Sequence, residues 1–157
     1  QHDALLSLVH NLTMGDNIGG LMPIICESVI VPSTNPMCKK FAYDVVRWCQ
    51  LEDHEWELVS SALKQDLTGP DELCHLALGL IPELPIHVAT ALVDEANRDI
   101  TACLSSGSAD VRAAAAEVVG HLLSTDGTMM HLSSSLSLEQ VVDMWTDRVI
   151  RLLTDFE

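Results

Sequence analysis

The segment His54-Glu55-Trp56-Glu57 is the part of this chain that comes nearest to a catalytic metal motif. In zinc metallopeptidases, two histidines four residues apart on one helix face bind the metal, and a glutamate between them acts as the general base. Four residues after His54 stands Leu58, so the second ligand is missing. Acidic residues gathered here fit the first turn of a helix, where the macrodipole stabilises negative charge. We therefore expect a solvated helix start and no zinc.

Other ionisable residues also lack the spacing that catalysis or metal binding requires. Asp94, Glu95 and Asp99 share one face of a predicted helix, but no calcium-binding loop accompanies them, so we expect a solvated face. The sequence has no phosphate-binding glycine loop, dinucleotide fingerprint or nucleophile elbow. We predict no catalytic, cofactor-binding or metal-binding residues, no cofactor, and no enzymatic activity. The histidines are scattered: His2, His10, His54, His75, His87, His121 and His131.

Lys39-Lys40 is the one pair of adjacent basic residues in an acidic chain. It could contact a phosphoinositide headgroup or an acidic partner. Two charges give little affinity at physiological salt, and we therefore expect both lysines on a solvated face.

The cysteines are odd in number and follow no zinc-binding spacing. Each falls within a predicted helix, where a free cysteine commonly packs as a small apolar residue. We expect them to be reduced and buried, which favours the cytosol. They are Cys26, Cys38, Cys49, Cys74 and Cys103.

Composition limits the fold and the partners. The 157 residues are 48% hydrophobic, with a mean hydropathy of +0.23, which is enough for a sizeable core. Aromatic residues are only 4%, and the abundance of Leu, Ala and Val favours helices over strands. A net charge of −15 repels phosphates. We therefore expect protein partners, no nucleic acid, and only indirect association with membranes.

One pattern of residues occurs three times. The turns at Asn35-Pro36, Pro70-Asp71 and Asp110-Val111 each open a helix, and a small residue follows at Ala42, Ala77 and Ala115. The intervals are about 35 and 38 residues, which is typical of HEAT and armadillo repeats. Since each helix pair must bury its apolar stripe against a neighbour, we predict an all-α, HEAT/armadillo-like α-α superhelical solenoid with a right-handed twist and no sheet. We expect residues 1–157 to form a single helical-repeat segment.

Periodicity predicts about eight helices. The second contains Pro23, which we interpret as a marker of its start. The segment Asp126 to Ser137 allows either a short helix or an irregular loop. We expect Trp48 and Trp145 to lie in the core, and the exposure of Trp56 stays open. The expected helices cover about 5–12, 18–30, 36–49, 52–67, 71–81, 86–104, 110–123 and 138–153.

The order of several motifs resembles a known family. Seven motifs of this chain resemble, in order and nearly in spacing, the amino-terminal trunk of the β-adaptin-like large subunits of the TSET (TPLATE) complex. That complex is related to the clathrin adaptor and COPI coats. The motifs are Lys39 to Val46, Trp56, Lys64 to Leu67, Pro70-Asp71, Ala102 to Leu104, Asp110 to Arg112 and Trp145. The run Ala113 to Ala116 and the stretch from Gly127 to Ser135 depart from that family's pattern. The resemblance implies an adaptin trunk fold, with this chain as the amino-terminal part of a longer trunk.

The resemblance also implies a function. It implies a non-catalytic scaffold in clathrin-mediated endocytosis and vesicle trafficking, cytoplasmic and recruited to the plasma membrane and clathrin-coated pits. Its partners would be other adaptor-like subunits, namely medium, small and a second large subunit, with clathrin reached through the complex. The sequence does not identify partner-binding residues. A karyopherin-type transport receptor and a phosphatase or kinase regulatory scaffold remain as alternatives, since both share the predicted fold.

Overall fold

The structure is a computed structural model that describes residues 2–14 and 19–124. The regular secondary structure of these residues is all helical, with no strand, which confirms the all-α prediction. The chain divides into two compact units, Gln1–Leu84 (unit 1) and Pro85–Glu157 (unit 2). The stretch after Ser124, including Gly127 to Ser135 and the helix expected to hold Trp145, lies outside the described residues.

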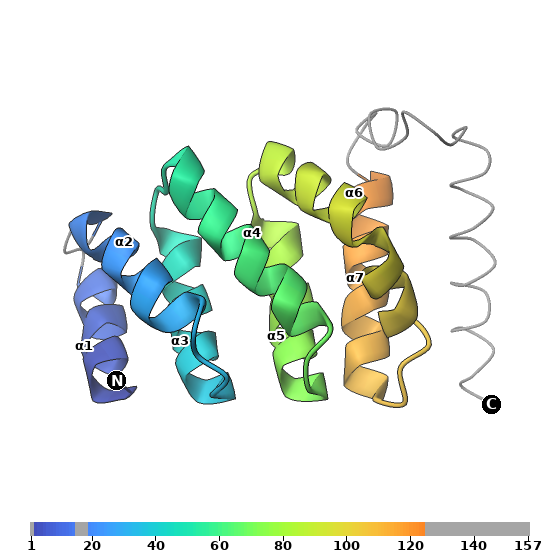
Figure 1. The fold of residues 1–157 in the computed structure, drawn as a ribbon, viewed down its shortest axis with the longest axis horizontal. Coiled ribbons are helices and arrows are strands. Elements are labelled where there is room, and N and C mark those ends of the chain that lie inside the picture. The colour runs from blue at the N-terminus through green and yellow to red at the C-terminus, as the bar shows by residue number, and fades with distance from the viewer. Residues whose placement is uncertain (1, 15–18, 125–157) are drawn as a thin grey trace. The chain divides into compact units, whose positions relative to one another are not determined.

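Unit 1 is built from helices that alternate in direction and form two layers (Figure 1). One layer holds α1 (His2–Thr13), α3 (Pro36–Trp48) and α5 (Asp71–Leu80), with α3 packed against both of the others. The second layer holds α2 (Met22–Ile25), the π-helix η2 (Cys26–Ile30) and α4 (Asp53–Leu67), and α4 also packs against α5. The described part of unit 1 also contains two short 3-10 helices, η1 (Gly19–Leu21) and η3 (Ile81–Glu83). Stacked helix pairs are what the repeat predicts, whereas the HEAT/armadillo class and the right-handed twist stay predictions.

Cap residues fix where the helices begin. The side chain of Asn35 accepts hydrogen bonds from the backbone N–H groups of Met37 and Cys38, while Pro36 occupies the first helical position of α3. Pro70 stands immediately before α5, and Pro23 lies in the first turn of α2, as expected. These local signals explain why the observed helices begin close to the predicted positions.

The core of unit 1 follows the repeat. Ala42 and Ala77, the small residues matched by the repeat, are both completely buried. Small side chains at these positions let α3 and α5 approach closely, and each is flanked by larger buried residues such as Val45 and Leu80.

Unit 2 is described through two helices, α6 (Ile86–Cys103) and α7 (Ala109–Ser124), which pack against each other. Ala115, the third matched small residue, is completely buried on α7, and Glu117 is exposed two residues later. The register predicted from the repeat is therefore confirmed. None of the helices within the described residues combines the length and the apolar character needed to cross a bilayer.

Candidate functional site

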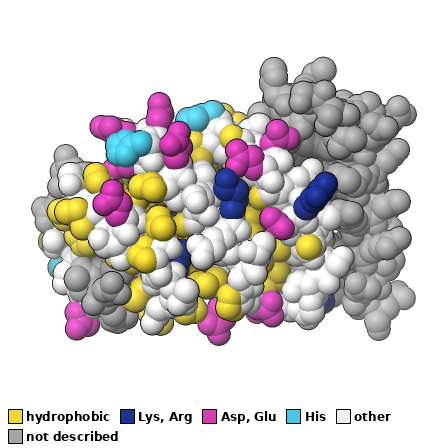
Figure 2. Space-filling model, viewed as in Figure 1, with side chains coloured by type: hydrophobic (Ala, Val, Ile, Leu, Met, Phe, Trp, Pro, Cys, Tyr) yellow, Lys and Arg dark blue, Asp and Glu magenta, His cyan; other side chains and the backbone are white. Residues whose placement is uncertain are grey.

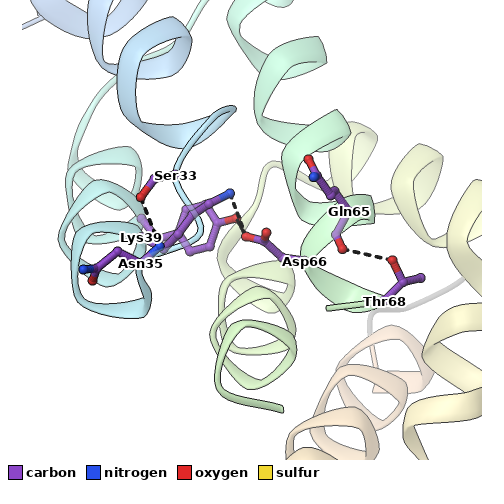
Figure 3. Close-up of polar contacts among 7 residues, drawn as sticks. Ser33, Asn35, Lys39, Gln65, Asp66 and Thr68 are labelled. Atoms are coloured by element: carbon purple, nitrogen blue, oxygen red, sulfur yellow. Dashed lines mark hydrogen bonds and ion pairs between the residues drawn. The ribbon is translucent and has the colours of Figure 1, made fainter. Parts of the chain in front are cut away.

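A buried polar cluster joins α3 to α4 (Figure 3). Lys39 and Tyr43 lie one turn apart on α3, and Asp66 lies in the last turn of α4. The Asp66 Oδ2 atom is 2.9 Å from the Lys39 Nζ atom, and it accepts a 2.5 Å hydrogen bond from the Tyr43 hydroxyl. The side chains of Lys39 and Asp66 are only 1% and 4% exposed. One carboxylate therefore serves two groups of the facing helix inside the core.

The Asp66 carboxylate is the negative charge that both Lys39 and Tyr43 contact in this cluster. The Lys39 Nζ atom is close enough to Asp66 for an ion pair but is not aligned for a hydrogen bond. It also lies 5.6 Å from the centroid of the Tyr43 ring, within cation–π range. Burial, the hydrogen bond to Asp66 and the charge of Asp66 raise the pKa of the Tyr43 hydroxyl, so it stays protonated and acts as a donor.

The cluster has little contact with solvent, so a diffusible substrate would not reach it. We interpret it as the element that fixes how α3 sits against α4. This placement corrects the expectation that Lys39 and Lys40 both lie on a solvated face. Lys40 is exposed, but Lys39 is buried because Asp66 supplies the opposite charge.

The segment His54 to Glu57 forms the start of α4. Glu52 is the N-cap, and its backbone N–H donates a 2.7 Å hydrogen bond to Glu55 Oε2, which makes a capping box. His54 is exposed, as expected, whereas Glu55 is buried, which corrects the expectation of a fully solvated helix start. Figure 2 shows acidic side chains and a histidine gathered where α4 begins.

Potential metal ligands do not cluster in the part of the chain that the structure describes. It holds no group of three or more His, Cys, Asp or Glu side chains placed to bind a metal ion. Asp94 and Glu95 are exposed on α6, and Asp99 is partly exposed, so the predicted solvated face is confirmed.

None of the five cysteines, all of which lie among the described residues, is in a disulfide. Cys26, Cys38, Cys74 and Cys103 are buried as expected, whereas Cys49 is partly exposed because α3 ends one residue before it. Burial, together with the charges of Glu55 and Glu27, raises the pKa of Cys26 to about 11. Burial and then Glu55 also raise the pKa of Cys49.

We expect slow alkylation of the native thiols by iodoacetamide at pH 8. A raised pKa lowers the fraction of thiolate, which is the reacting form, so even the accessible Cys49 should react slowly. Burial also keeps the reagent away from the other four thiols, which should react more slowly still. Labelling of Cys26 should rise only as the pH approaches about 11. Peptide mapping by mass spectrometry checks this, with the urea-unfolded chain as the control. Rapid native labelling of Cys26, or a mass deficit from disulfides, would contradict it.

The end of α3 carries an exposed tryptophan. Trp48 is 78% exposed, which corrects its predicted place in the core, while Trp56 on α4 is partly exposed. The side chain of the neighbouring Arg47 contacts residues of α3, α5 and η3. Its Nε atom pairs with Glu83 at 2.8 Å, its Nη1 atom with Asp44 at 2.7 Å, and its Nη2 atom donates to the Gly79 carbonyl oxygen.

The chain is similar along almost its whole length to a large plant protein. It is 26% identical to Protein TPLATE of Arabidopsis thaliana over 156 residues, which are 99% of this chain and 13% of that protein. No family model matches the chain, and no solved structure matches it. The similarity supports the predicted TPLATE-like fragment, and it extends well beyond the motifs from Lys39 to Trp145 on which that prediction rests.

Proposed function

We propose that this chain is a non-catalytic scaffold segment of a TPLATE-like adaptor subunit, acting in clathrin-mediated endocytosis and vesicle trafficking through contacts with other proteins. The observation that carries the proposal is the match to TPLATE over 99% of the chain. The two layers of helix pairs in unit 1 and the net charge of −15 support it, because stacked helices present broad surfaces and the charge disfavours nucleic acid.

The proposed partners are the other adaptor-like subunits of a coat complex, with clathrin bound through that complex. Their recruitment would place the protein in the cytoplasm at the plasma membrane and coated pits, with membrane contact made indirectly. The absence of catalysis belongs to the same proposal. It is supported by the Lys39, Tyr43 and Asp66 cluster, whose reactive groups are paired with one another inside the core.

Deletion of residues 1–157 from the full-length protein that carries them is expected to reduce co-purification of the other adaptor-like subunits and recruitment to plasma-membrane foci. The physical reason is that removing a scaffold surface removes all of its contacts at once. The measurement is affinity purification with quantitative mass spectrometry, together with imaging of the tagged protein.

The matched control is the full-length protein with Glu117→Gln, a single exposed change that should leave both readouts unaltered. An intact complex and normal foci after the deletion would overturn the proposal. Co-purification of nuclear transport factors would favour the karyopherin alternative instead, and phosphatase or kinase subunits would favour a regulatory scaffold.

A further inference from the structure

We draw no further inference here: the strongest candidate, the run of exposed apolar side chains along η1, α2 and the end of η2 in unit 1 (Leu21, Ile24 and Val31), carries no proposal, because nothing in the structure shows what covers it.

Discussion

Replacement of Asp66 by alanine is expected to lower the free energy of unfolding of the chain by about 3–5 kcal/mol, the range found when one partner of a buried ion pair is removed. The change leaves the Lys39 ammonium group buried without its counter-charge, and it takes the acceptor away from the Tyr43 hydroxyl. Both groups are too deeply buried to be compensated by water without opening the contact between α3 and α4.

Urea unfolding followed by circular dichroism measures this loss, with Asp44→Ala as the matched control. Asp44 also pairs with a cation of α3, but that pair with Arg47 is about 30% exposed on each side, and its removal should cost about 1 kcal/mol or less. The triple change Lys39→Met, Tyr43→Phe and Asp66→Leu should recover most of the stability lost in Asp66→Ala. Equal losses for Asp66→Ala and Asp44→Ala would show that the cluster does not stabilise the fold.

Ala115→Glu is expected to destabilise the chain by several kcal/mol. Ala115 is completely buried on α7, so the new carboxylate would be buried without a partner, in space sized for one methyl group. The control is Glu117→Gln on the exposed face of the same helix, where the change should stay within about 0.5 kcal/mol. Thermal unfolding of both variants measures the difference. Equal midpoints would mean that the register of α7 is wrong.

Sequence reasoning predicted the helices and the small buried positions well, because both depend on local information. A turn residue such as Asn35 and an apolar stripe repeating along one helix identify a helix without reference to the remainder of the chain. Ala42, Ala77 and Ala115 were placed correctly because a repeated packing arrangement demands a small side chain at the same point in each unit.

The burial of Lys39 could not be predicted from such local patterns. Its partner Asp66 stands 27 residues away on another helix, and contacts of that separation leave no mark in helical periodicity. A signal was nevertheless present. Lys39 shares a face with Ala42 and Val46, and Asp66 shares one with Ala62 and Leu63, so each of the two opposite charges stands on an apolar stripe of its helix. Two opposite charges, each within an apolar stripe, predict a buried ion pair better than a solvated face.

Trp48 was misplaced for a different physical reason. It follows Val45 at helical spacing, so the periodicity of α3 assigns it to the buried stripe. Burial also requires a neighbouring element beside the last turn, and α3 ends at Trp48 itself. Periodicity gives the direction of a side chain and says nothing about what lies in that direction.

The shared carboxylate of Asp66 also restricts how this sequence can diverge over generations. Lys39, Tyr43 and Asp66 depend on one another, so a lineage that exchanges Asp66 first must pass through a variant with a buried and uncompensated cation. Such a variant is removed by selection when little stability is in reserve. The three positions should therefore behave as a single inherited character, kept together or replaced together by apolar residues. They would offer a more discriminating comparison among distant relatives than overall identity does.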